Sequence, residues 1–396
     1  MTLRLPTICI LLAAATAAVA QPVTDGVVNV TDYADLVIDP GGEAEDWQPA
    51  FQAAAAEAYE TGMALYVPAG KFLIRKAIDL TPPPADKRPF LWQSIRLIGA
   101  GQWRSIISQE SEDQNCVDWS GPTYKESTSH GRLDDICLRG GVTVLNVKWH
   151  NHFVMDTCYI EGGSQYGVHA EGWSSRFLNS TIRWGTVAGF YGGGHFNNCI
   201  IRDCYFSRDG IGILLNGVHG SRIEGCGLES CARAAIYVRY TRGLTISNSY
   251  FEGNGYRLPD RFPFEEVPNT ITLDRNCLSV MIHDNIFRLN RDDEGGIIAI
   301  ADLTHGHIYD NLFYNYNPSL YGILLRGTAE TKPELPTSIS DVIVEGNHFT
   351  ELLAKPLAED TPGVLDRAVE AGCEFDWELS PPGPVALPDG PRNNEP

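Results

Sequence analysis

The sequence has little methionine, a deficit of basic residues and no long hydrophobic run after its first twenty residues. Only 4 of its 396 residues are methionine, whereas 39 are glycine. This composition disfavours a helical bundle and favours short strands joined by turns that contain glycine. The hydrophobic fraction of 43% is sufficient for a continuous core, which excludes a chain that is disordered throughout.

Acidic residues outnumber basic ones by 50 to 30, which gives a formal net charge of -20. This balance excludes nucleic acid as a partner, because its phosphates would be repelled, and it disfavours an anionic membrane surface. A polyanionic substrate would need a local basic patch or a bound Ca²⁺ ion that reverses the field. The sequence contains no cysteine and histidine spacing typical of zinc sites and no glycine-rich phosphate loop.

The first 20 residues have the features of a secretory signal peptide. Arg4 supplies a positive charge, residues 5–15 are largely apolar, and Ala18-Val19-Ala20 forms a small-residue cleavage site before Gln21. No lipidation cysteine follows this site, and no later stretch is long enough to span a bilayer. We therefore expect a secreted or periplasmic protein without a membrane anchor, whose mature chain keeps nine of the ten cysteines.

Three zones are expected after the signal sequence. A cap covers about residues 27–101, repeat coils cover about residues 116–350, and a proline-rich flexible tail covers residues 379–396. Residues 21–378 would form one domain. In the cap, Asp46 is a suitable N-cap for a helix that contains Ala50 to Ala58 and ends at Gly62. Strands are expected at residues 64–67, 72–74 and 94–99.

A six-residue pattern recurs through the second zone and is the strongest signal in the sequence. Its fourth position is occupied, at steps of about 22–24 residues and then at longer steps that imply loop insertions, by Cys158, Ser180, Cys204, Cys226, Ser249, Asn285, Asn311 and Asn347. A short strand cannot bury its inner face alone, but stacked coils pair strands about 4.8 Å apart and bury one shared core. The period therefore predicts a parallel β-solenoid.

The fourth position is predicted to be a corner at which side chains of successive coils stack. Asn285, Asn311 and Asn347 would form an amide ladder, and three cysteines would lie in the same column. Two states of these cysteines remain open: buried thiols, or a disulfide between Cys204 and Cys226 on adjacent coils, whose distance the coil spacing allows.

Motifs of the cap match a known family. They are Asp32-Tyr33, Asp39-Pro40-Gly41, Asp46, the Ala-Phe-Gln-Ala-Ala run at residues 50–54, and the run Tyr-Val-Pro-Ala-Gly-Lys-Phe at residues 66–72. In these motifs the chain resembles the pectate lyase superfamily, in its rhamnogalacturonase/epimerase-like branch, although Ala34-Asp35 replaces the Gly-Ala of that family. The resemblance implies an all-β fold, a single-stranded right-handed parallel β-helix with an N-terminal helical cap. This fold hosts lyases, hydrolases, epimerases and non-catalytic spikes.

The resemblance also implies a substrate groove along the strands that follow the third turn of each coil. Alternation along those strands turns a defined set of side chains outward. They are His169, Glu171, Tyr191, Leu214, Asn216, Tyr237, Arg239, Thr272, Asp274, Ile298, Leu324 and Arg326, and His195, His219, Asp302 and His305 follow on turns. Polysaccharide contacts are predicted for His169, Glu171, Tyr191, His195, Asn216, Asp302 and Arg326. The alternative for any one of them is a polar residue that simply faces water.

Tyr237, Arg239 and Asp274 are the predicted catalytic residues of a polysaccharide lyase. Arg239 would neutralise a uronate carboxylate, and Tyr237 would take or return a proton during β-elimination. Asp274 lies one coil on, about 5 Å away, and would orient Arg239 or share a Ca²⁺ ion. The alternative is a surface ion pair between Arg239 and Asp274 that contributes little.

Hydrolysis on the same fold is a second hypothesis. It needs two carboxylates about 5–5.5 Å or about 6.5–9.5 Å apart. Glu171 and Asp274 lie four coils apart, about 19 Å, and do not qualify, whereas Asp274 and Asp302 on neighbouring coils do. Glu265 and Glu266, on an insertion before Thr270, are further candidates. The motif series of polygalacturonases and of the main pectate lyase family are missing, so a non-catalytic glycan-binding or surface β-helix is a third hypothesis.

Overall fold

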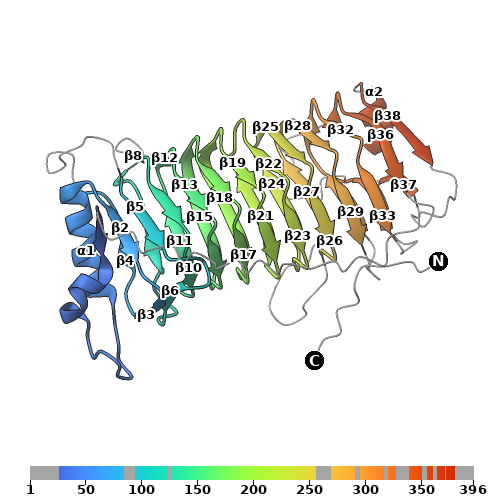
Figure 1. Ribbon diagram of the computed structural model, residues 1–396. Helices are drawn as coiled ribbons and strands as arrows, with labels where there is room; N and C mark the ends of the chain where they lie inside the picture. Colours follow the sequence, from blue (N-terminus) through green and yellow to red (C-terminus); the bar gives the residue numbers. More distant parts are fainter. Residues whose placement is uncertain are drawn as a thin grey trace, which may run out of the picture.

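The computed structural model describes residues 26–83, 94–123, 127–255, 269–289, 295–315, 320–326, 339–349, 355–359, 364–370 and 372–379. The predicted signal sequence, the predicted tail from residue 380 and the insertion with Glu265 and Glu266 lie outside the described residues. The described chain forms a rod of stacked coils with the predicted helix at one end (Figure 1). The all-β, parallel solenoid architecture predicted from the repeat is confirmed.

The helix of the cap, α1, covers residues Gln48–Thr61, and Gly62 ends it in the left-handed conformation with φ 71°. Asp46 lies one position earlier than an N-cap would, yet its Oδ1 accepts the backbone N–H groups of Gln48 and Arg75 at 3.0 and 3.1 Å. A short 3-10 helix, η1 (Val30–Leu36), precedes α1. The side chains of Ala50, Phe51, Ala54, Ala55 and Ala58 are buried and join the solenoid core.

Each full coil contributes one strand to each of three stacks. The stack that carries the predicted groove, here called the groove sheet, is an 11-stranded parallel sheet in the described residues. It consists of β4 (Ile78–Asp79), β7 (Val117–Asp118), β11 (Thr143–Val147), β15 (Tyr166–Trp173), β18 (Ala188–Asn197), β21 (Ile211–Asn216), β24 (Ala234–Arg239), β27 (Ile271–Arg275), β30 (Gly295–Ile300), β34 (Leu320–Leu325) and β37 (Lys355–Glu359).

The other two stacks meet at the predicted tight corner. The second stack consists of β1 (Val27–Asn29), β2 (Ala64–Val67), β5 (Arg96–Gly99), β9 (Arg132–Asp134), β13 (Val154–Asp156), β16 (Arg176–Leu178), β19 (Ile200–Arg202), β22 (Arg222–Glu224), β25 (Arg242–Ser247), β28 (Cys277–His283), β31 (Leu303–Thr304), β32 (His307–Tyr309), β35 (Ile339–Ser340), β36 (Ile343–Phe349) and β38 (Glu374–Leu379). The third stack consists of β3 (Gly70–Ile74), β6 (Ser105–Gln109), β10 (Cys137–Arg139), β14 (Tyr159–Glu161), β17 (Thr181–Arg183), β20 (Tyr205–Ser207), β23 (Gly227–Glu229), β26 (Tyr250–Glu252), β29 (Ile286–Leu289) and β33 (Leu312–Asn315).

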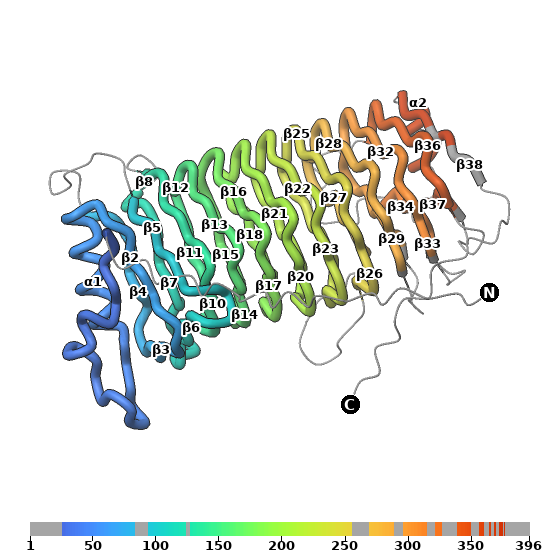
Figure 2. The backbone as a smooth tube through the Cα atoms, in the orientation of Figure 1, coloured from blue at the N-terminus to red at the C-terminus, as the bar shows by residue number. Residues whose placement is uncertain are grey.

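Two smaller features complete the described chain. The strands β8 (Thr128–Ser129) and β12 (His150–Asn151) form a separate parallel pair, and Thr128 and His150 are buried. Near the last coils, a second helix, α2 (Val364–Glu370), contacts β35 and β37. The coils therefore continue beyond residue 350, where the repeat pattern was expected to end, and the regular succession of turns is visible along the backbone (Figure 2).

The predicted corner ladder is confirmed by its hydrogen bonds. The Asn285 backbone N–H and Nδ2 donate to Asn311 Oδ1 at 3.1 and 3.0 Å, and Asn311 makes the same two bonds to Asn347 Oδ1. Serines serve in the same way, since the Cys158 and Cys226 backbone N–H groups donate to serine Oγ atoms of the next coil. All nine cysteines of the described residues are buried free thiols, so the disulfide alternative is not realised.

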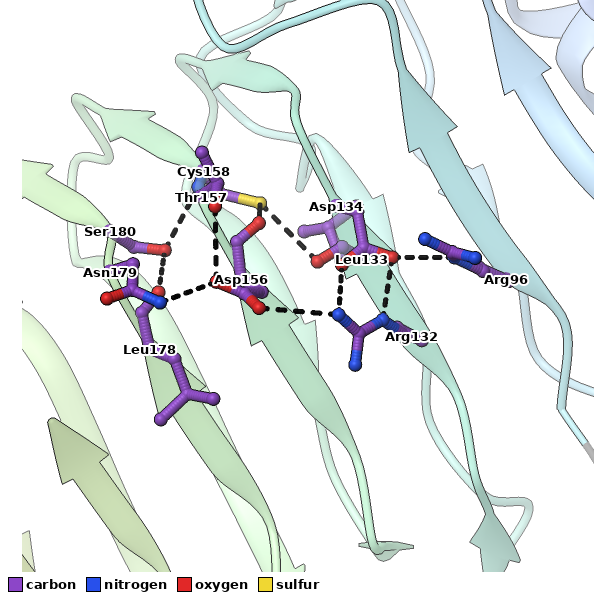
Figure 3. A network of polar contacts seen from close by, with 10 residues as sticks. All are labelled: Arg96, Arg132, Leu133, Asp134, Asp156, Thr157, Cys158, Leu178, Asn179 and Ser180. Carbon is purple, nitrogen blue, oxygen red and sulfur yellow. Dashed lines mark hydrogen bonds and ion pairs between the residues drawn. The ribbon is translucent and has the colours of Figure 1, made fainter. Parts of the chain in front are cut away.

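Figure 3 shows the early part of this corner, where charged side chains outside the core connect successive coils. Asp134 accepts Arg96 Nε at 2.7 Å and Arg132 Nε at 2.8 Å, and Arg132 Nη2 lies 3.3 Å from Asp156 Oδ2. Asn179 Nδ2 then donates to Asp156 Oδ1 at 2.9 Å. Inside the corner, Cys158 and Ser180 continue the buried column. The coils are thus connected on both sides of the same turn.

The core inside the rod contains columns of identical residues. The rings of Phe251, Phe287, Phe313 and Phe349 stack nearly parallel, with centroids 4.7, 4.9 and 4.6 Å apart. One expected outward residue belongs to this interior. Ile298 pairs with Ile271 and is completely buried, whereas its neighbour Ala299 pairs with the outward Thr272. The prediction for Ile298 was therefore wrong by one residue. Residues 297–300 are Ile-Ile-Ala-Ile, and a run of apolar residues shows no alternation between inward and outward positions.

Candidate functional site

The outer face of the groove sheet carries the predicted row of side chains in register. The Cα partners along this row are His169, Tyr191, Leu214, Tyr237 and Thr272, one from each of five successive coils. Two residues further along the strands, Asn216 pairs with Arg239. The predicted residues do not form one site, however. Their contacts divide them into two clusters on this face.

The first cluster, the Tyr237 cluster, consists of Tyr237, Arg239 and Asp274. The Tyr237 hydroxyl donates to Asp274 Oδ2 at 2.8 Å, Arg239 Nε donates to the same oxygen at 2.7 Å, and Arg239 Nη2 donates to the tyrosine oxygen at 2.8 Å. The three predicted catalytic side chains therefore form a closed triangle of hydrogen bonds.

A β-bulge places Asp274 in this triangle. Val238 pairs with Leu273 and Arg239 with Arg275, so Asp274 is the extra residue of β27. A bulge re-aims the side chain of the extra residue and is common beside active sites. Simple alternation placed Asp274 on the outer face but gave no reason for direct contact with both Tyr237 and Arg239.

Two guanidinium groups contact the Tyr237 ring. Arg233 and Arg239 each have their guanidinium carbon 5.0 Å from the ring centroid, within the range of a cation–π contact. Arg275 Nε lies 3.7 Å from Asp274 Oδ2. Three arginines thus contact a cluster that has one carboxylate. This arrangement gives a local excess of positive charge on a chain whose formal net charge is -20.

Burial divides the roles of the three side chains. Tyr237 is only 3% exposed, whereas the Arg239 and Asp274 side chains are 38% and 21% exposed. Burial and the Asp274 carboxylate together raise the pKa of Tyr237 far above its ordinary value, so its hydroxyl stays protonated. Burial lowers the pKa of Arg239, but Tyr237 and Asp274 outweigh this effect and raise it, so Arg239 stays charged. The charged groups of Arg239 and Asp274 are the ones that solvent reaches.

The second cluster, the His169 cluster, consists of Tyr166, His169, Glu171 and Tyr191. His169 Nε2 lies 3.1 Å from Glu171 Oε1. The rings of Tyr166 and Tyr191 stack at 4.9 Å with an interplanar angle of 20°, and the His169 ring centroid lies 4.7 Å from that of Tyr191. Two stacked aromatic rings beside a carboxylate provide both an apolar face and a hydrogen-bond acceptor for a ligand.

Electrostatics fix the charge state of the histidine and the glutamate. Burial lowers the pKa of His169 more than its contact with Glu171 raises it, so the ring is neutral at neutral pH. The hydrogen bond from His169 lowers the pKa of Glu171, which Lys148 and His195 lower further against the effect of burial. His195 was expected on a turn but lies within β18, from which it acts on this cluster electrostatically.

His169 lies three coils from Tyr237, about 14 Å at the strand spacing, and Tyr191 lies two coils from it. Glu171 and Asp274 thus belong to different clusters, as their separation along the chain predicted. Asp302 accepts the backbone N–H of Asn276 at 2.8 Å and so lies beside the corner between β27 and β28. Asn216 lies between the two clusters on the row of Arg239, and the backbone of Arg326 follows β34 and donates to Ile300.

No group of three or more histidine, cysteine, aspartate or glutamate side chains that suits a metal ion occurs among the described residues. Asp274 brings one carboxylate, and its oxygen Oδ2 accepts hydrogen bonds from Tyr237 and Arg239. The described residues of the Tyr237 cluster therefore do not fit the shared Ca²⁺ ion considered from the sequence, which takes six to eight oxygen ligands.

The sequence reasoning missed Tyr166, Arg233 and Arg275. Tyr166 was missed because the alternation of inward and outward residues breaks at the start of the strand. Gly167 faces the inside of the rod, where an added Cβ would lie 2.9 Å from Ile182, and the next residue, Val168, is also buried. Two consecutive inward residues leave Tyr166 facing outward. The recurrence of small residues at Gly167, Gly189 and Gly212, one per coil, was the available signal.

Comparison with known proteins agrees with this geometry. Residues 140–313 match the family described as the right handed beta helix region. Combined with the stacked parallel strands, this match decides the fold. The chain is a right-handed parallel β-helix. No curated protein matches the sequence significantly.

Solved structures similar to this β-helix include enzymes and viral proteins. The mannuronan C-5 epimerase AlgE4 A-module of Azotobacter vinelandii is 15% identical with a TM-score of 0.59, and the alignment covers 88% of this chain and all of that one. A tailspike mutant of E. coli bacteriophage HK620, in complex with a hexasaccharide, is 12% identical with a TM-score of 0.61 and coverages of 85% and 64%. The bacteriophage phi29 gene product 12 is 11% identical, with a TM-score of 0.56 and coverages of 84% and 50%. At these identities the likeness shows the fold.

Proposed function

We propose that this β-helix is a polysaccharide lyase that cleaves a polymer containing uronic acid by β-elimination at the Tyr237 cluster. One observation carries the proposal: on the outer face of the groove sheet, Arg239 and Arg275 contact the Asp274 carboxylate and Arg233 lies over the Tyr237 ring, although the chain as a whole is strongly acidic. An acidic protein needs such a local positive charge in order to bind a polyanion.

Arg239 is the residue that would bind the uronate carboxylate. Its Nε and one Nη2 proton are directed to Asp274 and Tyr237, but a guanidinium has five N–H donors in a planar fork. The side chain is 38% exposed, so further donors reach solvent. Neutralising the carboxylate makes the adjacent C5–H bond more acidic, which is the requirement for elimination.

Asp274 would carry the proton in this reaction. It accepts the proton from C5 as the C4–C5 double bond forms, and it returns that proton to the glycosidic oxygen as the bond between C4 and that oxygen breaks. No other reactant is needed, and the charge on Asp274 is restored. Tyr237 is almost completely buried, so it acts here as a positioning residue that holds Asp274 by its protonated hydroxyl.

The comparisons support a glycan as the ligand class but leave the reaction open. The epimerase is named for a uronate polymer, and the tailspike was solved with a hexasaccharide bound. Along the groove sheet, the stacked rings of the His169 cluster offer a further contact for the same chain, two to three coils from Arg239. Predicted contacts at Asn216, between the two clusters, are part of this proposal.

Ultraviolet absorbance of unsaturated uronic products, measured over a panel of acidic polysaccharides, tests the proposal. Asp274→Asn keeps the size of the side chain and should abolish this signal, and Arg239→Lys should weaken substrate binding because the fork geometry is lost. Asp203→Asn is the matched control, because Asp203 is an exposed carboxylate on another face. New reducing ends without the absorbance would indicate hydrolysis and contradict the elimination.

A non-catalytic glycan-binding protein is the second candidate. The observation in its favour is that Tyr237, Arg239 and Asp274 satisfy one another with three hydrogen bonds, which a purely structural cluster would also do. Retention of the β-helix on an acidic polysaccharide, without any product, would favour it. Asp274→Asn would then change affinity and nothing else.

Export belongs to the same proposal. A polysaccharide outside the cell is reached only by an exported protein, and the N-terminal sequence has the pattern of a cleavable signal peptide. Among the described helices, none is long and apolar enough to cross a membrane. Mass analysis of protein recovered from the medium or periplasm should give a chain that begins at Gln21.

A further inference from the structure

A row of aromatic side chains follows the outer face of the third stack, away from the groove sheet. The register aligns Tyr159, Thr181, Tyr205, Gly227 and Tyr250 in one line along the rod. The tyrosines therefore recur at every second coil, about 9.6 Å apart, with a small residue between them. A regular row of rings on a rigid sheet is not required by the core, which lies on the opposite side of these strands.

The first ring of the row is supplied by a neighbouring residue. The Trp103 and Tyr159 rings are in tilted contact, with centroids 4.2 Å apart and an interplanar angle of 48°, and Trp103 is 60% exposed while Tyr159 is buried. Tyr205 and Tyr250 are 40% and 36% exposed. We call Trp103, Tyr159, Tyr205 and Tyr250 the aromatic row.

The tyrosine rings are held down against the sheet. A Cβ built on Gly227 would lie 3.0 Å from Tyr205, so this ring covers the glycine of the next coil, and its hydroxyl is hydrogen-bonded to Glu229 of that coil. The Tyr250 hydroxyl donates to Glu252 Oε2, two residues along its own strand, at 2.8 Å. Each ring therefore lies along the surface and presents a face to solvent, at low entropic cost for a ligand that stacks on it.

The charges beside the row cancel. The parallel line of residues two positions along these strands contains Arg139, Glu161, Arg183, Ser207, Glu229, Glu252 and Arg288, three basic and three acidic side chains. Arg139 is paired with Glu161 at 2.8 Å and Arg288 with Glu252 at 3.5 Å. This face is thus neutral and rich in hydrogen-bonding groups, unlike the chain as a whole and unlike the arginine-rich Tyr237 cluster.

We propose that the aromatic row is a second carbohydrate-binding surface, which takes an extended, uncharged polysaccharide. Sugar rings with equatorial hydroxyls have apolar faces that stack on flat aromatic rings, and every second sugar of an extended chain repeats its orientation. Two coils of the β-helix match that repeat in length. The neutral flanking line supplies hydrogen bonds without repelling or selecting an anion. The surface would hold the protein on a glycan matrix while the groove sheet acts on another polymer.

Affinity electrophoresis of the full chain in native gels tests this proposal, with hydroxyethyl cellulose or arabinoxylan as neutral ligands and polygalacturonate as an anionic one. The neutral polymers should retard the protein. Tyr205→Ala and Tyr250→Ala should each weaken the affinity measured by this retardation about five- to ten-fold, as expected for loss of one stacked ring. In the double variant, the fold-loss of affinity should be about the product of the two single losses, because the rings lie far apart. Tyr205→Phe should retain most of the affinity.

Tyr240→Ala is the matched control, because Tyr240 is 41% exposed at a corner outside the row. Wild-type affinity in the double variant, an equal loss in Tyr240→Ala, or no retardation by any neutral polymer would overturn the proposal. So would sedimentation data that show the row mediating self-association. Cleavage of a short soluble uronate substrate should be unchanged in Tyr205→Ala and Tyr250→Ala, so failure here and failure of the lyase proposal are distinguishable.

Discussion

Replacement of Asn311 by leucine should destabilise the protein strongly, although leucine has a similar size and suits a buried position. Asn311 Oδ1 accepts the Asn285 backbone N–H and side-chain Nδ2, and Asn311 Nδ2 donates to Ile282 O at 2.8 Å and to Asn347 Oδ1 at 2.9 Å. Asn311 Nδ2 also donates to Tyr309 O at 3.0 Å, and a leucine side chain removes all five of these bonds. The buried Asn285 N–H then has lost its acceptor in a column that water does not reach.

The magnitude follows from these contacts. An orphaned buried N–H costs about 1–3 kcal/mol, and each further hydrogen bond lost costs about 1 kcal/mol. Burial of additional apolar surface by leucine offsets part of this loss, so we expect a decrease of about 3–4 kcal/mol in the free energy of unfolding. Asn311→Ser is the informative control, because Ser249 already accepts the Cys226 N–H in the same column. Serine restores the acceptor, and the expected loss falls to about 1–2 kcal/mol.

Equilibrium unfolding in urea, followed by circular dichroism and by tryptophan fluorescence, measures both variants. The order wild type, Asn311→Ser, Asn311→Leu should hold with both signals. A leucine variant as stable as wild type would show that the ladder contributes packing and not hydrogen bonding. Equal losses in the two variants would refute the argument that the acceptor oxygen is the group that matters.

Three further predictions concern buried or strained groups. His150 is buried and accepts the Gly131 N–H at Nε2 at 2.9 Å, and burial lowers its pKa to about 3. Because an unfolded histidine has a pKa of about 6.5, lowering the pH below that value should reduce the free energy of unfolding by up to about 1.4 kcal/mol per pH unit. This contribution should be absent in His150→Gln. Burial raises the pKa of Asp209 well above its ordinary value, so stability should fall as the pH rises above about 4, and Asp209→Asn should remove that fall in calorimetric melts across pH. Thr157 has φ 54°, which a β-branched residue rarely adopts, and Thr157→Gly should raise the melting temperature by a shift equivalent to about 1 kcal/mol; an unchanged or lower value would contradict the strain.

The architecture was predictable from the sequence because it depends on a period. The steps between Cys158, Ser180 and Asn285 fix which residues lie above one another, and neither loop conformation nor side-chain detail changes that order. The insertions lengthen individual coils, yet the Asn285 ladder continues across them. A single column of small polar residues therefore predicted the corner correctly along most of the rod.

The contacts of the candidate site were less predictable, because they depend on places where the alternation breaks. Gly167 and Val168 both face inward, which turns Tyr166 to the outer face. A bulge adds Asp274 to its strand and brings it onto Arg239. Each irregularity arises from local packing between neighbouring coils, and a sequence pattern with a period of two contains no information about it.

The helix α1 has a consequence for the behaviour of the whole rod. It lies across the end at which the first coil would otherwise expose its core, and its alanine-rich face is buried there (Figure 1). An uncovered solenoid end exposes unpaired strand edges and core residues, on which a second molecule can stack its own coils. Deletion of residues 48–61 should thus convert a discrete particle into end-to-end polymers, whose growth would be seen by light scattering. The helix therefore prevents the rod from growing at this end.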